Sequence, residues 1–217
     1  DNELSENSEG CYGINSSATF TGNVVRERQA GTGVTDCWGT IFYNYDRSSR
    51  GRVPACQPVD TSLSENPRSG NYDVTVSYNT MDFDCRADSY GLYVGDFGTS
   101  NTLDLEGHYN VITDFDNNVY IEDSAGQITS AVMTSNILET DCFTDSYNLV
   151  NDADVTVDAT GSWWGDETGP YHPTTNPSGL GGDVSDNVDY EPWLGGNIYC
   201  DPDPLDLTVA SPSGDID

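Results

Sequence analysis

The sequence predicts an all-β protein wound as a solenoid of stacked coils, and three observations support this. No window of fifteen residues keeps apolar side chains at helical spacing, because Gly, Asn, Asp and Pro interrupt each one. Short runs of β-branched and aromatic residues recur instead, as in 73–76, 127–129 and 155–157. The third observation is a hidden repeat of about 26 residues.

The repeat is marked by a short phrase in which a turn residue precedes a pair that contains a large apolar side chain. The turn positions are Asn23, Asn79, Asn110, Asn136 and Ser162. The last three follow one another at this spacing, whereas the interval between the first two is about twice as long and leaves room for one unmarked turn. Asparagine tolerates the left-handed conformation, and its side chain can bond to the same residue type one coil away. Such a period with short strands is typical of a solenoid, whose coils bury their apolar faces by stacking.

A second sequence repeat, here called an echo, does not involve the asparagines. The segment CRADSYGL from Cys85 and the segment CFTDSYNL from Cys142 match at five positions and lie about two repeats apart. CYG at Cys11 and CWG at Cys37 recur one repeat apart. Both echoes support the repeat.

The six cysteines lack the spacing of zinc ligands, which indicates disulfides and an oxidising compartment. Cys11 and Cys37 lie one period apart and therefore within reach of each other. Cys85 and Cys142 lie two coils apart, roughly 9.6 Å at the spacing of paired strands, so we expect each to pair elsewhere. The predicted disulfides are Cys11–Cys37, Cys56–Cys85 and Cys142–Cys200.

The charge is strongly acidic. Asp and Glu number 37 against seven basic residues, all of them arginine, and the formal net charge is −30. The 11% of aromatic residues and the even spread of the acids argue for a folded chain rather than a disordered one. A folded, lysine-free, acidic surface favours a halophile, a haloarchaeon, as the source, since salt screens the self-repulsion. This charge excludes nucleic acid and anionic membranes as partners, and no apolar run approaches the length of a membrane span.

The segment 161–194, GSWWGDETGPYHPTTNPSGLGGDVSDNVDYEPWL, resembles the closing segment of secreted right-handed parallel β-helix repeat proteins. The matching residues are Trp163, Trp164, Gly165, Gly169, Pro170, Gly181, Gly182, Val184, Ser185, Val188, Pro192, Trp193 and Leu194; Ser162 departs from the usual Asn. The resemblance covers about residues 11–194. It implies a single-stranded right-handed parallel β-helix of three short sheets, which follows a polar extension (1–10) and precedes an extended C-terminal arm (195–217).

The tryptophans of this segment are predicted to cover the end of the solenoid. The last coil has no successor, so its apolar end needs bulky side chains above it. We expect Trp163, Trp164 and Trp193 to serve as this end cap. An exposed tryptophan platform for sugars is the alternative.

Carboxylates follow the asparagine turns and form a candidate acidic stripe. They are Glu27, Asp82, Asp84, Asp114, Asp116, Glu139, Asp141 and Asp166. Some proteins with the fold that the resemblance implies are polysaccharide lyases or hydrolases, and paired carboxylates suit glycoside hydrolysis. Oxygen ligands also suit Ca²⁺, for which Asp84, Asp116 and Asp141 are the candidates. A solvated acidic face explains the stripe more simply, since only Arg86 offers a base near Asp84.

The two histidines offer no second site. His108 and His172 lie far apart in the repeat, which argues against a histidine metal site and against a Ser-His-Asp set. We therefore expect no catalytic activity and no cofactor, with Ca²⁺ as the one candidate ion.

The ends of the chain suggest secretion and assembly. The first residue is Asp1 rather than Met, as expected of a mature secreted protein, and the sole glycosylation sequon is at Asn15. Residues 205–210 alternate with period two and predict an extended arm, with Leu205, Leu207 and Val209 on one side. The basic cluster Arg47, Arg50 and Arg52 suits contact with an acidic neighbour.

These features predict a non-enzymatic extracellular or cell-surface protein. We expect it to assemble head-to-tail with copies of itself as a surface fibre or adhesive appendage. The arm would add a strand to a neighbour's sheet, and the arginine cluster would lie at the joint. The alternatives are a module that binds or cleaves surface polysaccharide, or a piece of a viral fibre.

Overall fold

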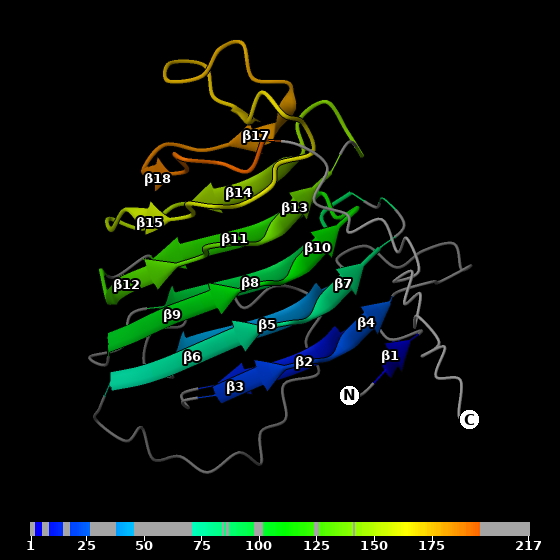
Figure 1. The fold of residues 1–217 in the computed structure, drawn as a ribbon. Helices are drawn as coiled ribbons and strands as arrows, with labels where there is room; N and C mark the ends of the chain where they lie inside the picture. The colour runs from blue at the N-terminus through cyan, green and yellow to red at the C-terminus, as the bar shows by residue number, and fades with distance from the viewer. Residues whose placement is uncertain are drawn as a thin grey trace, which may run out of the picture.

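The computed structural model describes residues 3–5, 9–14, 18–26, 38–45, 71–83, 85, 87–97, 102–123, 126–140 and 142–195. They form a parallel β-solenoid, which confirms the predicted fold class (Figure 1). The described part of the chain consists of strands and turns and contains no helix. A helix that is long and apolar enough to cross a membrane is accordingly not found there.

Three parallel sheets form the sides of the solenoid, and the chain visits them in the order A, B, C. Sheet A consists of β1 (Glu3–Ser5), β4 (Val24–Arg26), β7 (Thr80–Asp82), β10 (Val111–Thr113) and β13 (Ile137–Glu139). Sheet B consists of β2 (Glu9–Ile14), β5 (Trp38–Tyr45), β8 (Tyr90–Phe97), β11 (Asn117–Asp123), β14 (Tyr147–Asn151), β17 (Gly181–Val184) and β16 (Pro170–Tyr171). Sheet C consists of β3 (Ala18–Thr21), β6 (Asn71–Ser77), β9 (Thr102–His108), β12 (Ile128–Val132), β15 (Val157–Asp158) and β18 (Val188–Asp189).

Each coil lies directly on the one before it. From β6 to β18 the chain returns to sheet C four times, so this part of the solenoid has four turns. The colours of Figure 1 accordingly rise in sequence order from β1 at one end to β18 at the other. Right-handed winding is the sense that twisted parallel strands favour, and it stays a prediction.

The prediction of an unmarked turn between Asn23 and Asn79 is wrong. Strand β4 pairs directly with β7, in register from Val24–Thr80 to Arg26–Asp82. The interval of 56 residues from Asn23 to Asn79 therefore belongs to a single long coil, and its additional residues lie between the strands. Residues inserted into a coil lengthen the interval without adding a level to the stack.

The interior is filled by columns of apolar side chains, one from each sheet. In sheet A, Met81, Ile112 and Leu138 are in register and fully buried. Their neighbours on the same strands are only half-buried, as alternation along a strand requires. Sheets B and C contribute similar columns, which include Leu92, Val119 and Leu149, and Val74, Leu105 and Ala131.

The predicted asparagine contacts between coils are confirmed as a buried ladder. The Oδ1 atom of Asn110 accepts the backbone N–H of Asn79 at 3.1 Å and its side-chain amide at 3.0 Å. The same two bonds join Asn23 to Asn79 and Asn110 to Asn136. At the end of the ladder the Ser162 hydroxyl accepts the N–H of Asn136 at 3.1 Å. Ser162 therefore occupies an asparagine position, as the repeat predicted.

The left-handed residue of each bend is not the asparagine but the residue before it. These preceding residues all have positive φ: Gly22, Tyr78, Tyr109, Ser135 and Gly161. The left-handed residue turns the backbone so that the following Asn or Ser side chain points inward and meets the next coil. The expectation that asparagine itself supplies the left-handed conformation is therefore wrong for this ladder.

Candidate functional site

The predicted acidic stripe is interrupted on sheet A. Thr113 lies in register between Asp82 and Glu139, and its hydroxyl donates a hydrogen bond of 3.2 Å to Asp82. The two carboxylates are therefore two coils apart. Asp166 accepts bonds from the N–H and hydroxyl of Thr168, and these bonds lower the pKa of Asp166. The structure does not bring these acids together as a carboxylate pair.

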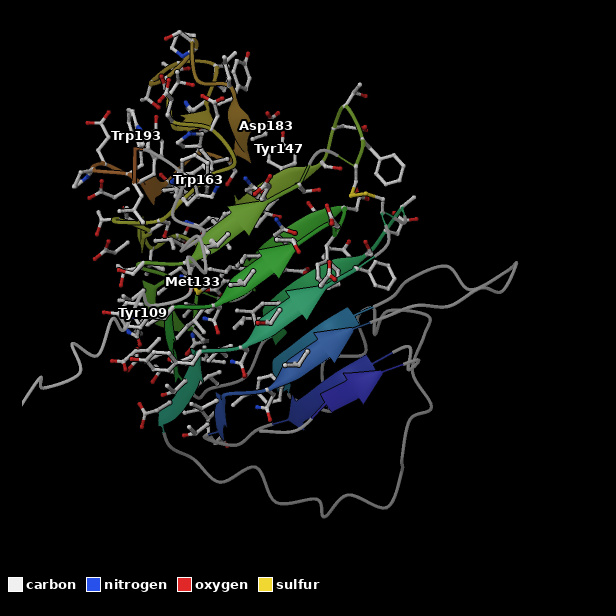
Figure 2. The ribbon with its side chains drawn as sticks, turned by 45° about the vertical axis from the view of Figure 1, so that its right-hand side comes forward. Tyr109, Met133, Tyr147, Trp163, Asp183 and Trp193 are labelled. Atoms are coloured by element: carbon white, nitrogen blue, oxygen red, sulfur yellow. A yellow bond between two sulfur atoms is a disulfide. The ribbon has the colours of Figure 1, made fainter. Side chains whose placement is uncertain are left out.

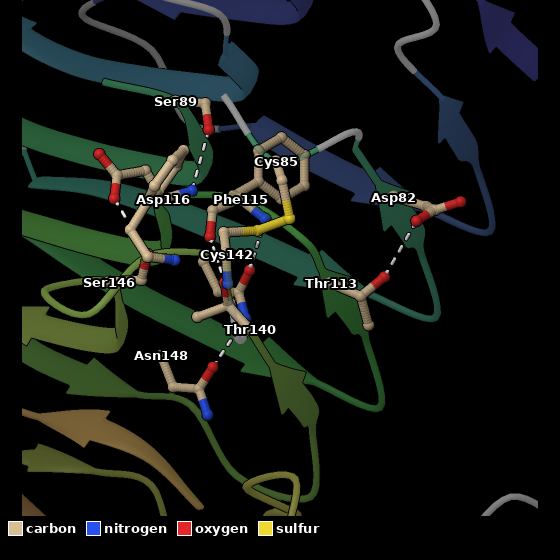
Figure 3. The surroundings of a disulfide bond; sticks show 12 residues. Asp82, Cys85, Ser89, Thr113, Phe115, Asp116, Thr140, Cys142, Ser146 and Asn148 are labelled. Atoms are coloured by element: carbon tan, nitrogen blue, oxygen red, sulfur yellow. Dashed lines mark hydrogen bonds between the residues drawn. A yellow bond between two sulfur atoms is a disulfide. The ribbon is translucent and has the colours of Figure 1, made fainter. Parts of the chain in front are cut away.

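Asp116 lies elsewhere, between the loop that follows β7 and the loop that follows β13 (Figure 3). We name this pair of loops, with Asp116 between them, the clasp. Its Oδ2 accepts the N–H of Asp88 at 2.8 Å and its Oδ1 accepts the Ser146 hydroxyl at 3.1 Å. Its own N–H donates to the Ser89 hydroxyl at 2.9 Å. Both carboxylate oxygens of this candidate Ca²⁺ ligand thus already accept hydrogen bonds from the protein. Ser89 and Ser146, which match in the two repeated segments, both bond to this one aspartate.

A disulfide joins Cys85 to Cys142, with the Cα atoms 5.0 Å apart. The predicted pairs Cys56–Cys85 and Cys142–Cys200 are therefore wrong. The expectation that the two half-cystines lie too far apart assumed that every coil turns its corner in the same way.

The corners differ in length, which explains the disulfide. Seven residues separate β7 from β8 and seven separate β13 from β14, but only three separate β10 from β11. The two long corners can therefore meet over the short one between them. Inside this clasp Phe83 stacks on Phe115 with ring centroids 5.1 Å apart, and the Thr140 hydroxyl donates to the Phe115 carbonyl at 2.6 Å.

The clasp also contains the one cluster of potential metal ligands found among the described residues. An oxygen of Asp114 lies within 4.8 Å of the Sγ atoms of Cys85 and Cys142. Metals bind cysteine as the thiolate, and both sulfurs are engaged in the disulfide. The arrangement in hand is therefore a covalent staple and not a metal centre.

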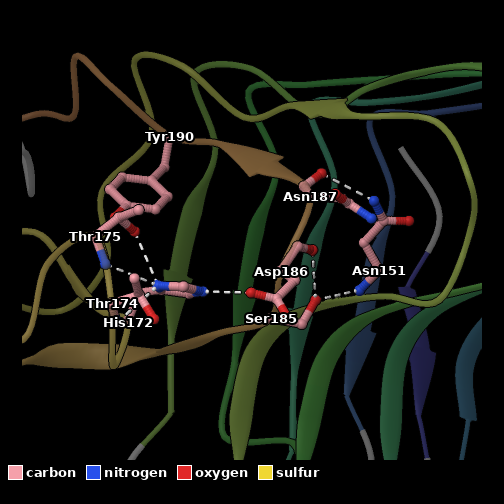
Figure 4. A network of polar contacts seen from close by, with 8 residues as sticks. All are labelled: Asn151, His172, Thr174, Thr175, Ser185, Asp186, Asn187 and Tyr190. Atoms are coloured by element: carbon pink, nitrogen blue, oxygen red, sulfur yellow. Dashed lines mark hydrogen bonds and ion pairs between the residues drawn. The ribbon is translucent and has the colours of Figure 1, made fainter.

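The polar network around His172 has no counterpart among the sequence predictions (Figure 4). His172 is buried, and its Nε2 lies 3.1 Å from Asp186 Oδ1. Its Nδ1 lies 3.1 Å from the N–H of Thr175 and 2.8 Å from the Thr175 hydroxyl, which in turn meets the Tyr190 hydroxyl. An amide N–H can only donate, so Nδ1 is the acceptor and Nε2 carries the proton that faces Asp186.

The contacts run from the Asp186 carboxylate through the His172 ring to the Thr175 hydroxyl, as they run from acid through base to nucleophile in a hydrolase triad. The nitrogen that would take the proton of Thr175 is, however, already an acceptor for the backbone N–H groups of Thr174 and Thr175. This geometry is that of a side chain that closes a turn. The network attaches the 172–175 turn to the last coil, and nothing in its spacing along the sequence repeats, which is why the pattern did not reveal it.

The paired tryptophans lie near the start of the closing segment, where Trp163 forms a parallel bridge to Ile137 of β13. Trp164 is fully buried in the core and Trp163 is 8% exposed, so neither offers an open ring face to a sugar. Trp193 packs partly buried against the core, and its indole N–H donates to the Glu167 carbonyl at 3.1 Å. Gly169, at φ +79°, allows this packing, because a Cβ there would lie 2.6 Å from the Trp193 ring. These positions are compatible with the predicted end cap.

Two tyrosines on the corner between sheets C and A are the most exposed aromatic residues of the described chain. Tyr78 and Tyr109 are 62% and 56% exposed, and their rings stack with centroids 5.1 Å apart. Both have the left-handed backbone conformation, which costs a bulky residue roughly 1–2 kcal/mol. Ring stacking returns only about 0.5–1.5 kcal/mol. The fold alone therefore gives little reason for tyrosine at positions where other coils have Gly22 and Gly161.

Many predicted site residues lie outside the described part of the chain. These are Glu27, Asp84, Arg86, Asp141, Arg47, Arg50, Arg52, Asn15, Cys37, Cys56, Cys200, Leu205, Leu207 and Val209. Cys11 is in β2 opposite Thr40 of β5, and Cys37 lies outside the described residues. The Cys11–Cys37 disulfide stays a prediction.

Comparison of the whole chain with family models, with curated proteins and with solved structures finds no match.

Proposed function

We propose that this chain is a non-enzymatic extracellular structural protein that assembles end to end with copies of itself, as a surface fibre or adhesive appendage of a halophile. The main support is the difference between the two ends of the solenoid. Strands β1, β2 and β3 each pair with a single neighbour among the described residues. Edges of this kind readily take up a further strand.

At the other end β16 and β18 also pair with a single described neighbour each, but bulky side chains of the closing segment are packed there. The closing segment adds β16 and β17 to sheet B and β18 to sheet C, and its Trp164 and Tyr190 are buried. Two unlike ends favour a head-to-tail contact, and a head-to-tail contact that does not close on itself generates filaments. The predicted arm, with Leu205, Leu207 and Val209 as its apolar side, is a suitable strand for the open edges of the next copy.

The disulfide and the acidic composition support the proposed location and habitat. The Cys85–Cys142 staple suits an oxidising, extracellular compartment. A net charge of −30 opposes contact between copies in dilute buffer, and molar salt screens that repulsion. The arginine cluster Arg47, Arg50 and Arg52 would neutralise acidic groups at the joint.

Sedimentation velocity in molar salt tests the proposal, with the full chain compared with a chain shortened to end at Leu194. We expect large, concentration-dependent species from the full chain and monomers from the shortened chain. A matched control replaces Leu205, Leu207 and Val209 by Ser in the full chain, which keeps the length of the arm but removes its apolar side. Monomers from all three chains at every protein concentration would contradict end-to-end assembly.

A further inference from the structure

The bend between sheets C and A carries no charged residue over four successive coils. The segments 77–81, 108–112, 134–138 and 160–164 stack in successive coils, as the backbone bonds Tyr78 N–H to His108 O and Ser135 N–H to Thr160 O show. Ten of these twenty residues are buried and ten are at least partly exposed, and none of them is Asp, Glu, Lys or Arg, whereas a fifth of the whole chain is charged. We name this surface the uncharged stripe; in Figure 2 its member Tyr109 lies lower on the solenoid and its member Trp163 lies higher, with one coil between them.

The stripe has sharp borders. On sheet C, Glu106, Asp158 and Asp189 lie on one row of the register with Val132. On sheet A, Asp82 and Glu139 lie on one row with Thr113. On each side of the stripe, acidic residues therefore occur one or two residues beyond its border, in the same strand or in the strand paired with it. The absence of charge in between is a local property of this surface.

The stripe contains a pair of stacked aromatic rings and several hydroxyl groups. Tyr78 and Tyr109 stack on each other, and the same position in the next two coils is held by the small residues Ser135 and Gly161. The face of the Tyr109 ring that is turned away from Tyr78 therefore has only the small residue Ser135 at the corresponding position of the next coil. The hydroxyls of Thr134 and Thr160 belong to the same levels; that of Thr134 bonds His108 at 2.8 Å, and that of Thr160 donates to Asp158 at 2.8 Å.

We propose that the uncharged stripe binds a neutral saccharide chain that runs along the solenoid axis. Aromatic faces are electron-rich and attract the C–H face of a sugar ring, and the neighbouring hydroxyls can exchange hydrogen bonds with sugar hydroxyls. The carboxylates on both borders repel uronates and sulfated glycans, which selects for uncharged sugars.

A second copy of the chain fits the stripe less well. Four coils at the strand spacing make the stripe roughly 20 Å long, and three outward columns make it roughly 10 Å wide. The resulting area of roughly 200 Å² is well below the ~800 Å² that each partner buries in a stable protein interface. A copy would also bring its own bordering carboxylates. This inference concerns the side of the solenoid and does not depend on the proposed assembly through its ends.

The test measures binding of neutral gluco-, manno- and galacto-oligosaccharides, beside oligo-uronates of equal length, by calorimetry in the lowest salt that keeps the protein folded. The variants are Tyr78→Asn and Tyr109→Asn, because asparagine accepts the left-handed backbone and removes only the ring. Ser135→Asp places a carboxylate within the stripe. Phe143→Asn is the control, since Phe143 is another exposed aromatic residue and lies outside the stripe.

We expect at least one neutral oligosaccharide to bind and the oligo-uronates not to bind. Tyr109→Asn and Ser135→Asp are expected to weaken this binding at least tenfold without lowering Tm, and the control to leave it unchanged. Three results would overturn the inference: no neutral sugar binds at millimolar concentration, Phe143→Asn weakens binding as much as Tyr109→Asn, or Tyr109→Asn abolishes a dimer of the native chain.

Discussion

At the scale of single residues, the asparagine ladder is the feature that ties the repeat to the fold. The buried amides of Asn79, Asn110 and Asn136 each accept two bonds from the coil before and donate to a carbonyl of that coil, as Asn110 does to Val76 at 2.8 Å. A buried group that loses its partner costs more than the bond itself contributes. The ladder therefore explains why these positions are occupied by Asn, or in one coil by Ser.

Replacement of Asn110 by Ala should destabilise the fold by about 3 kcal/mol, since it leaves the Asn79 amide groups without an acceptor at roughly 1–3 kcal/mol for each lost bond. Asn110→Ser should cost less, because Ser162 shows that a hydroxyl can accept the N–H of the preceding coil and donate to a carbonyl. Chemical denaturation measures both. Equal costs for Ala and Ser would contradict the role of the ladder.

Asp183 provides a prediction on pH. Partial burial raises the pKa of this carboxyl above its usual value. The folded state therefore keeps this proton to a higher pH than the unfolded state does. The free energy of unfolding falls as the pH rises from the pKa of the unfolded state through the higher pKa of the folded state. Asp183→Asn should therefore raise Tm at pH 7 and leave Tm unchanged at about pH 3, below the usual pKa of Asp. A variant that raises Tm equally at both values would contradict this explanation.

The residue scale also shows which contacts a sequence pattern can reveal. The ladder and Ser162 were predictable because each recurs with a fixed period. Tyr78 and Tyr109 lie in the same phrases, and the lack of charge in those phrases is a signal that the sequence displays but that the predictions did not use. The contact of His172 with Asp186 leaves no such signal, since it joins two irregular turns 14 residues apart.

At the scale of elements, the corners between strands determine which residues meet. A three-residue corner between two seven-residue corners brings Cys85 to Cys142 and lets Asp116 bind both long loops. The sequence displays the echo of the two long corners, but the echo alone does not show that the corner between them is short. That is the physical reason why the predicted pairing failed although the repeat itself was correct.

The Cys85→Ser/Cys142→Ser double variant should lose about 4 kcal/mol of stability, because the bond joins residues whose sequence separation is 57. Denaturant unfolding with and without a reducing agent measures this loss. The reductant should destabilise the native chain by at least a similar amount, and it should affect the double variant only through the predicted Cys11–Cys37 disulfide. Peptide mapping that joins Cys85 to any other cysteine would refute the clasp.

At the scale of the whole molecule, charge and shape act together. The chain has a net charge of −30, and at about 10 mM salt the Debye length of about 30 Å lets charges repel one another across a molecule of this size. At about 1 M salt the length falls to about 3 Å. Tm should therefore rise steeply with salt, and it should rise equally in NaCl and KCl because screening depends on ionic strength. A Tm that is the same at both concentrations would contradict adaptation to high salt.

Assembly is the central claim, and electron microscopy of the full chain in molar salt tests it most directly. Sheet C has six strands and sheet B has seven, so one subunit is roughly 29–34 Å long at the spacing of paired strands. End-to-end stacking predicts filaments with an axial repeat of about this length. Single particles of 23.5 kDa at every protein concentration would contradict it.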